Sequence, residues 1–297
     1  RSGVVLNAVT SPMGNVLRNM PEALGTRLDP ALKLNEFLGK EEGKTVLCVS
    51  SGPSLKHAMK DLQRLSGKHS ILTVGRNFKM LQAAGIKVDY VFSCEMFPWD
   101  SVIFDGISLE STEDSILCYP PVCAPETVRK WPGRKVCTWD ANTAEMIGEP
   151  LGMTGGNSVS HHLYNFACEI LRCESVVLVG QDLAYTEPDG ITHAEGTFHN
   201  FPEAVAKEDS LPQAEDWGPV THDLIGPFHL GCHVNPVWVG GGMKPVGGPL
   251  VRPSPSYKNF GTLFEILIKR HRRRTWNACP NGLKIAGAPY LDLSTLA

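Results

Sequence analysis

The sequence predicts an α/β fold in which a doubly wound, mostly parallel sheet carries helices on both faces. Short, almost entirely apolar runs alternate with longer segments whose apolar residues repeat at helical spacing. Strands that are apolar on both sides are typical of parallel sheets buried between two helical layers. Polar or glycine-rich turns follow several of the runs, as they do where such sheets bind ligands.

The composition places the chain among water-soluble globular proteins. With 297 residues it is long enough for one large domain or two small ones. A net charge of -3 gives no general attraction to nucleic acid or an anionic membrane. No apolar run approaches the ~20 residues of a membrane-spanning helix, and no signal peptide is evident. We therefore expect a cytoplasmic protein that neither binds nucleic acid nor spans a membrane.

The chain begins with Arg1 rather than Met, which is expected of a trimmed or excised piece of a longer protein. Its nine cysteines include no CxxC pair and no zinc-ribbon spacing. Free thiols are therefore expected, as in a cytosolic protein, and no metal site is expected.

The chain divides into a flank at 1–43 and a main domain at 44–297. The flank has few periodic apolar positions and is expected to pack against the main domain. In the main domain seven apolar runs predict strands, at 44–50, 70–74, 88–94, 115–119, 134–139, 175–180 and 274–279. Helical spacing predicts helices at 55–65, 77–85, 154–173 and 257–274, with Gly85 as a C-terminal cap of the second.

This alternation stops at about 186–256, where glycine and proline are concentrated. A long irregular segment within a compact domain is usually a functional lid or a disordered insertion. We expect a lid that belongs to the site.

Five turns are expected at one edge of the sheet, beyond the carboxyl ends of the strands, where doubly wound sheets bind ligands. They are "SSGPS", "GRN", "CE", "GQD" and "TGGNS". No Walker A motif, GxGxxG motif or nucleophile elbow is present. The five turns together predict a single site.

The first turn suits an anion. Gly52 lets the backbone approach a ligand, while Pro53 and Ser54 begin a helix whose amides attract negative charge. A tight turn with a serine cap is the plainer interpretation. The same design recurs in a second turn, at Gly155, Gly156, Asn157 and Ser158.

Charged and amide side chains follow three of the other strands. Arg76 and Asn77 can bind a phosphate, a sugar or a base edge, although Arg76 is also suited to a surface ion pair. Glu95 and Asp182 can bind a hydroxyl group or a metal ion, and Asp182 can instead cap the next turn.

Tyr185 and His193 lie on the loop after the sixth strand. A histidine beside an anion site is a natural general acid or base, because its pKa lies near neutrality. A loop histidine bonded to a carbonyl is the alternative, and His199 is a weaker second candidate. His161 and His162 adjoin in a helix and face different ways, which argues against a shared task.

These motifs resemble the central domain of Maf proteins, the motility-associated flagellin glycosyltransferases. The similar segments are "VLCVSSGPSLK", "TVGRNFKMLQAAGIKVDYVFSCE", "GGNSVSHHLYNFACEILRCESVVLVGQDLAY", "THAEG" and "TWNACPNGLKIAG". The order of motifs is also similar, more distantly, to that of bacterial CMP-sialic acid transferases. The resemblance covers residues 45–287, whereas Maf proteins carry further domains on either side.

The resemblance implies a Rossmann-like domain that binds a CMP-activated nonulosonic acid of the sialic, pseudaminic or legionaminic type. The sugar would pass to a Ser or Thr hydroxyl of flagellin or a similar acceptor. It also implies a place around the nucleotide for Gly52, Pro53, Ser54, Arg76 and Asn77. Gly156, Asn157 and Ser158 would contact the phosphate or sugar. Gln181 and Asp182 would line the pocket, and His193 or His199 would serve the chemistry. No cofactor is required, because CMP is a good leaving group.

Two other functions stay open. The same domain family includes archaeal 6-hydroxymethyl-dihydropterin pyrophosphokinases, which would need Mg²⁺ held by Glu95 and Asp182. A non-catalytic module that binds a nucleotide sugar would bind CMP without turnover and would tolerate the loss of His193.

Overall fold

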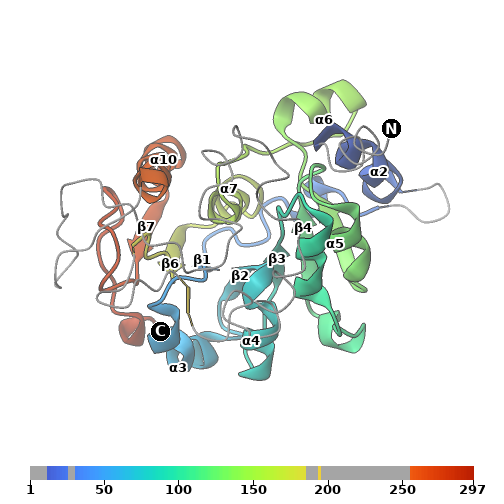
Figure 1. Cartoon of the computed structure of the whole chain (residues 1–297). Helices are drawn as coiled ribbons and strands as arrows, with labels where there is room; N and C mark the ends of the chain where they lie inside the picture. Colours follow the sequence, from blue (N-terminus) through green and yellow to red (C-terminus); the bar gives the residue numbers. More distant parts are fainter. Residues whose placement is uncertain (1–11, 26–30, 185–192, 195–254) are drawn as a thin grey trace.

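The computed structural model describes residues 12–25, 31–184, 193–194 and 255–297. Within them a seven-stranded sheet has the order β5-β4-β3-β2-β1-β6-β7 (Figure 1). The strands are β1 (Thr45–Val49), β2 (Ser70–Val74), β3 (Tyr90–Phe92), β4 (Ile116–Tyr119), β5 (Arg134–Cys137), β6 (Ser175–Val179) and β7 (Arg274–Asn277). The helices are α2 (Pro12–Leu24), α3 (Leu55–Leu65), α4 (Phe78–Ala83), α5 (Pro125–Lys130), α6 (Ala141–Ile147), α7 (Val159–Asn165) and α10 (Pro255–His271). Short 3-10 helices are η1 (Leu34–Phe37), η2 (Gly75–Asn77), η3 (Pro98–Phe104), η4 (Glu110–Thr112) and η8 (Leu293–Thr295).

All neighbouring strands run parallel, and the strand order changes direction at β1. Strands β2 to β5 extend from one side of β1, while β6 and β7 extend from the other. Thr45 pairs with Ser175 of β6, and Val46 pairs with Ser70 of β2. The predicted doubly wound α/β fold is therefore confirmed, with its switch point between β1 and β6.

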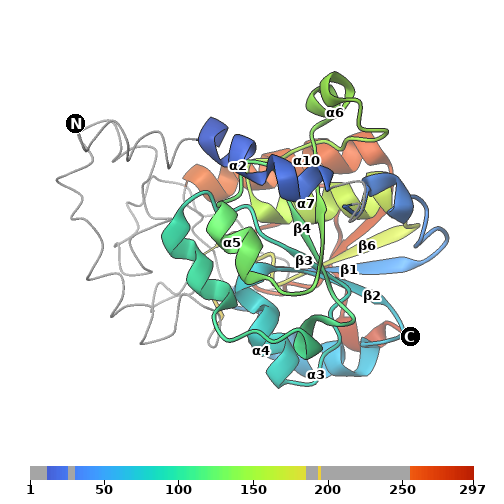
Figure 2. The same cartoon turned by 90° about the vertical axis from the view of Figure 1, so that its right-hand side faces the viewer.

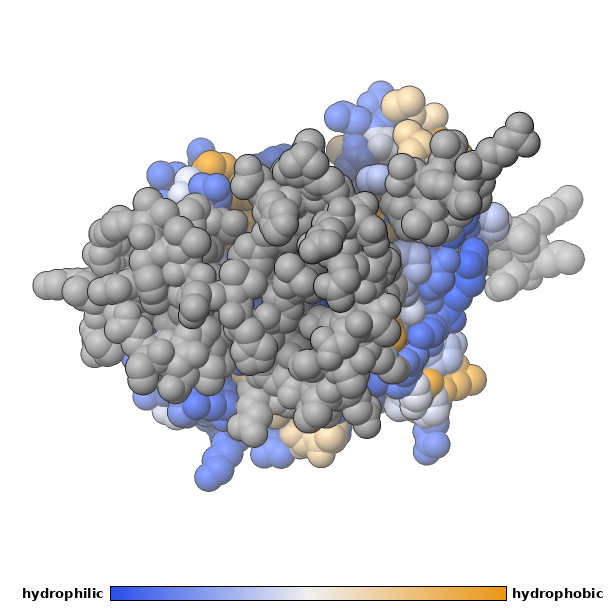
Figure 3. Space-filling model, in the orientation of Figure 1, coloured by the Kyte–Doolittle hydropathy of each residue, from blue (hydrophilic) through white to orange (hydrophobic). Residues whose placement is uncertain are grey.

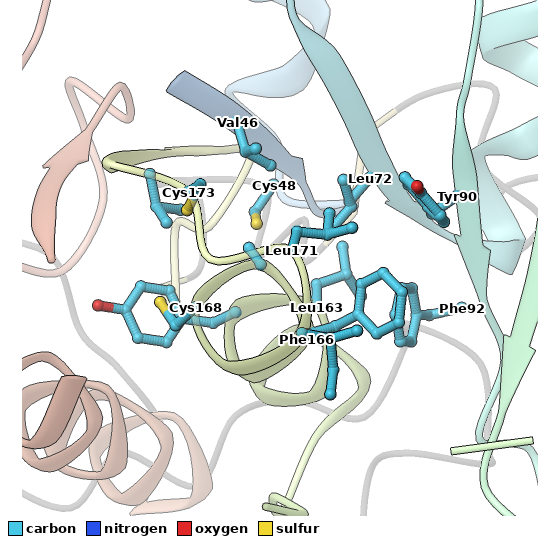
Figure 4. Close-up of a cluster of buried hydrophobic side chains, with 14 of the residues drawn as sticks. Val46, Cys48, Leu72, Tyr90, Phe92, Leu163, Phe166, Cys168, Leu171 and Cys173 are labelled. Carbon is cyan, nitrogen blue, oxygen red and sulfur yellow. The ribbon is translucent and has the colours of Figure 1, made fainter. Parts of the chain in front are cut away.

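Helices cover both faces of the sheet, as the all-apolar strands predict. Val46 and Cys48 of β1 face a core formed with α7 and α10, while Leu47 and Val49 face a core formed with α3, α4 and α5. Figure 2 shows α7 and α10 above the sheet and α3 and α4 below it. Figure 4 shows Val46 and Cys48 of β1 in the first core, near Leu163 of α7 and Phe166 in the turn that follows α7.

The long helix predicted over 154–173 begins later and changes form. Ser158 is the last extended residue before α7, and α7 continues into a π-helical turn, Phe166–Ile170. The N–H of Leu171 donates to the carbonyl of Phe166 at 2.9 Å, which is the spacing of a π-helix. The buried residues of this stretch, including Leu163 and Ile170, are those that the apolar spacing predicts.

Helix α2 in the flank has its polar side buried. The Asn15 and Asn19 side chains are almost fully buried, whereas Met13 and Leu17 are 67% and 65% exposed. The Asn15 amide donates to the carbonyls of residues 96 and 122, both at 2.9 Å. The Asn19 amide donates to those of residues 121 and 123, at 2.9 and 2.7 Å. Side-chain hydrogen bonds to two loops therefore anchor α2, which explains its weak apolar pattern.

Apart from 193–194 and 255–256, the segment expected to form a lid, 186–256, lies outside the described residues. No described helix has the length and apolar character needed to cross a membrane. Figure 3 shows hydrophilic residues over the side of the molecule that α5 forms. The eight cysteines in the described part of the chain are free thiols, as expected.

Candidate functional site at the carboxyl edge of the sheet

The predicted turns meet at one edge of the sheet. Strands β1, β2, β3 and β6 are parallel neighbours, so the turns that follow them lie at the same edge. Hydrogen bonds join several of these turns directly, as described below. The expected convergence is therefore confirmed for the four turns that follow these strands, and it falls at the switch point where such folds bind ligands.

Gly52 lies where the first turn touches the turn after β6. Its N–H donates to the carbonyl of Gly180 at 2.7 Å. A Cβ atom at this position would lie 2.1 Å from the Asp182 Oδ2 and 2.4 Å from the Gly180 carbonyl oxygen. Gly52 is therefore needed because the turn after β6, at Gly180 and Asp182, lies close to its backbone.

Asp182 binds Ser54, the residue that precedes helix α3, across this junction. Its Oδ2 accepts hydrogen bonds from the backbone N–H of Ser54 at 3.1 Å and from the Ser54 hydroxyl at 2.8 Å. Burial raises the pKa of Asp182 to about 6, although both Ser54 bonds favour the ionised form. Pro53 is buried beside this contact. The carboxyl group holds the N–H of Ser54, one of the donors at the helix start where an anion was expected.

Ser50 connects three elements. Its hydroxyl donates to the Gln181 Oε1 at 2.7 Å and lies 2.9 Å from the Ser160 hydroxyl in the first turn of α7. Because the Ser50 proton is used on Gln181, Ser160 is the donor of the second bond. The Gln181 N–H donates in turn to the Cys279 sulfur at 3.0 Å. Gln181 therefore lies at the junction of β1, β6 and α7.

Asn77 is fully buried and bonded within the protein. Its Oδ1 accepts from the Ser51 hydroxyl at 2.8 Å, and its Nδ2 donates to the Thr73 hydroxyl at 3.2 Å and the Val49 carbonyl at 3.4 Å. Asn77 thus ties the first turn to β2. Its place around a nucleotide stays a prediction, and its side-chain atoms are engaged within the protein.

Arg76 forms ion pairs with two acidic residues. Its Nε lies 2.9 Å from the Glu95 Oε1, and its Nη2 lies 3.4 Å from the Asp100 Oδ1 on η3. The Arg76 side chain is only 12% exposed. The alternative of an ion pair is therefore observed, although the pair is largely buried instead of lying on the surface. Glu95, which was predicted to bind a hydroxyl group or a metal ion, is thus one of the two partners of Arg76.

His193 is brought to the first turn by its neighbour in the chain. The N–H of Ala194 donates to the carbonyl of Ser51 at 2.8 Å. Burial and the nearby charge of Arg76 lower the pKa of His193 to about 4. His193 is therefore neutral near pH 7, the form that a general base requires. Tyr185 and His199, the other candidates in this region, lie outside the described residues.

The second glycine turn, 154–158, lies before α7. Gly155 and Asn157 are exposed, while a Cβ atom on Gly156 would lie 2.3 Å from the His161 Cβ. The Ser158 hydroxyl bonds to the His161 Nδ1 at 2.9 Å, and the His161 Nε2 bonds to the carbonyl of residue 260 at 3.0 Å. Since a carbonyl only accepts, the proton of neutral His161 is on Nε2 and Ser158 donates to Nδ1. His161 therefore joins α7 to α10.

Several residues of this edge were not predicted from the sequence. Ser50 and Ser51 belong to a turn that was predicted, but their partners did not follow from the pattern. Asp100 lies in a 3-10 helix whose sequence has no apolar periodicity. Ser160 and Cys279 are distant in the sequence from their partners, Ser50 and Gln181, and reach them only in the folded chain. No local signal marks such residues.

The described side chains can be tested as ligands for a metal ion. Within the described residues, no three or more His, Cys, Asp or Glu side chains are grouped so that they could hold a metal ion. The two carboxylates considered for Mg²⁺ are already engaged, Glu95 with Arg76 and Asp182 with Ser54. As placed, these two residues do not fit a magnesium site.

Comparison with known proteins gives two findings. A family model described as 6-hydroxymethylpterin diphosphokinase MptE-like matches residues 15–188. A solved structure, the Maf glycosyltransferase from Magnetospirillum magneticum AMB-1, is similar with a TM-score of 0.68 and 14% sequence identity. The similarity covers 98% of this chain and 39% of that one, so this chain spans about two fifths of its neighbour. No curated protein matches the chain. The resemblance to Maf proteins is thereby confirmed at the level of the fold.

Proposed function

The chain belongs to the 6-hydroxymethylpterin diphosphokinase MptE-like family, and from this premise we propose that it is a glycosyltransferase whose donor is a CMP-activated nonulosonic acid. The observation that carries the proposal is the position of His193. A neutral histidine lies at the first turn of a switch-point site, on the fold that a Maf glycosyltransferase also has. The proposed acceptor is a Ser or Thr hydroxyl of flagellin or a similar protein.

In the proposed reaction the acceptor oxygen attacks the anomeric carbon of the sugar. The bond from that carbon to the phosphate oxygen breaks, and CMP leaves with the bonding electrons. His193 removes the acceptor proton, and direct displacement of CMP from the opposite face gives inversion at the anomeric carbon. The proton therefore ends on the His193 imidazole.

Negative charge that grows on the leaving phosphate needs donors that are not already compensated. Arg76 is paired with two carboxylates, Glu95 and Asp100, and adds no net positive charge there. The backbone N–H groups of Gly155 and Gly156 are better suited, since preorganised amides stabilise developing charge efficiently. We therefore assign phosphate stabilisation to the second glycine turn.

Calorimetric titration with CMP, CDP, UDP, ATP and GTP tests the donor class, and release of CMP from CMP-nonulosonic acids tests turnover. We expect CMP to bind and CMP release to accelerate when a hydroxyl acceptor is added. Binding of ATP without any binding of cytidine nucleotides would overturn the proposal. Binding of CMP without turnover on any donor would favour a non-catalytic module.

A second candidate, diphosphate transfer to a 6-hydroxymethylpterin, is favoured by the description of the matching family. It needs Mg²⁺, and the engaged Glu95 and Asp182 do not fit that ion as placed. Activity measured with ATP and the pterin, with and without EDTA, distinguishes the two. Pterin diphosphate formation that EDTA abolishes would establish this candidate.

A further inference from the structure

Asn165 lies at the end of α7, directly beneath the second glycine turn. Its side chain is fully buried, and its Nδ2 donates to the carbonyls of Thr154 at 2.9 Å and Gly155 at 3.0 Å. One side-chain amide thus holds two successive peptide groups. We propose that Asn165 is a positioning residue that turns the N–H groups of Gly155 and Gly156 toward the ligand. This inference rests on the proposed function and names the residue that prepares its phosphate site.

The direction of the two N–H groups follows from peptide geometry. In a trans peptide the C=O and the N–H point in opposite directions. The carbonyls of Thr154 and Gly155 both point at Asn165, so the N–H groups of Gly155 and Gly156 both point away from it. Successive backbone N–H groups on the outer side of a turn can donate to an anion, such as a phosphate or carboxylate group.

These two N–H groups are available. Throughout the described part of the chain, neither the Gly155 N–H nor the Gly156 N–H donates a hydrogen bond. Gly155 is exposed, so a ligand can reach the turn. The preceding N–H, that of Thr154, is held at 2.7 Å by the Glu169 carboxylate. The turn is therefore fixed on its inner side and open on its outer side.

His271 at the end of α10 fixes the orientation of the Asn165 amide. Its Nε2 lies 2.9 Å from the Asn165 Oδ1, and its side chain is only 8% exposed. A rotated Asn165 would set its oxygen against two carbonyl oxygens and its N–H groups against the donor of His271. The helix that packs beside α7 thus determines which atoms of Asn165 face the turn.

The test compares CMP with cytidine, which has no phosphate, in Asn165→Asp. The aspartate keeps the shape but repels the two carbonyls, so the turn should lose its orientation. We expect CMP affinity to fall roughly tenfold to a hundredfold, as for lost hydrogen bonds to a charged group, while cytidine affinity stays the same. An equal fall for both ligands, or no fall, would overturn the inference.

Asn19→Asp is the matched control, because Asn19 is also buried and also donates to two carbonyls, far from the turn. It should leave both affinities unchanged. If Asn165→Asp does not fold, His271→Leu removes the restraint on the amide, and His271→Gln, which keeps an N–H donor, should restore CMP affinity. Equal CMP affinity in the Leu and Gln variants would contradict the inference.

Pyrophosphate separates this inference from the proposed function. If wild-type protein fails to bind CMP, the proposed donor is wrong, but pyrophosphate should still bind wild type more tightly than Asn165→Asp. If wild type binds neither CMP nor pyrophosphate, the inference fails as well.

Discussion

The Asp182 carboxylate accepts hydrogen bonds from both the backbone N–H and the hydroxyl of Ser54, which precedes helix α3 and lies 128 residues earlier in the chain. This contact joins the turns after β1 and β6 at the switch point. Because the carboxyl group is buried, the contact is also sensitive to pH.

Replacing Asp182 by Asn should change how stability depends on pH. The folded-state pKa of Asp182, about 6, lies above the ordinary value of 3.8 for an unperturbed aspartate carboxyl group. The folded protein therefore holds its proton more tightly, and wild type loses stability as pH rises from about 4 to 6. The loss is roughly 3 kcal/mol, from about two pKa units. Urea unfolding at several pH values should show this loss in wild type and not in Asp182→Asn.

Asp292 provides the control for that experiment. It accepts the same pair of bonds, from the N–H and hydroxyl of Ser294, but it is exposed. Those bonds lower the pKa of Asp292. The stability of wild type relative to Asp292→Asn should therefore increase as pH rises. This effect is opposite in sign to the effect at Asp182. A common sign for both positions would contradict the role of burial.

Gly156→Ala and Gly155→Ala should differ sharply in stability. A Cβ atom on Gly156 would lie 2.3 Å from the His161 Cβ, whereas on Gly155 the nearest atom, of His162, is 3.8 Å away. His161 cannot easily move, because both its ring nitrogens are bonded. We expect Gly156→Ala to destabilise by roughly 1–3 kcal/mol, the usual effect of overpacking. Equal unfolding temperatures for the two variants would show that the turn can adjust to a side chain at position 156.

His193→Ala should abolish most turnover without weakening CMP binding. Loss of a general base typically lowers kcat by about 100-fold to 10,000-fold. Since the pKa of His193 is about 4, the wild-type rate should stay level from neutral pH until the pH approaches that value. An acid limb near the ordinary pKa of histidine would point to a different base. His57→Ala, an exposed histidine of α3, is the control.

Arg76→Met should destabilise the protein far more than removal of an exposed cation. It leaves Glu95 and Asp100 largely buried without this partner, a situation that typically costs about 3–5 kcal/mol. Lys130→Met breaks an exposed pair with Asp105 and should cost at most about 1 kcal/mol. The pKa of His193, followed by NMR, should also rise in Arg76→Met, since Arg76 lowers it. An unchanged pKa would place Arg76 too far away to act.

The strands could be predicted closely from the sequence, because apolar residues on both faces leave a continuous signal. The observed β2 spans the same residues as the predicted run, 70–74, and β1 lies within one residue of each end of the predicted strand. Helix α2 could not be predicted, because Asn15 and Asn19 are buried while Met13 and Leu17 are exposed. Its stability comes from loops that the helix pattern does not reveal.

The candidate site was predictable as a place but not as a set of contacts. Parallel strands bring the turns together whatever their partners are, so the shared edge followed from the pattern. The pairs Ser54–Asp182 and Asn165–His271 link residues 128 and 106 positions apart. Such pairs depend on how helices pack across the sheet, and a single sequence does not encode them in any local spacing.

The central position of β1 exposes this chain to aggregation while it is being synthesised. Strand β2 follows β1 closely, but the other neighbour, β6, begins 130 residues after the start of β1. At ribosomal speeds of about 5–20 residues per second, the nascent chain waits on the order of ten seconds for that partner. During this time one edge of β1, which is apolar from Val46 to Val49, has no partner strand and can pair with strands of other molecules. Depletion of ribosome-associated chaperones should therefore reduce the soluble yield of this protein more than that of a protein whose sheet follows the chain order.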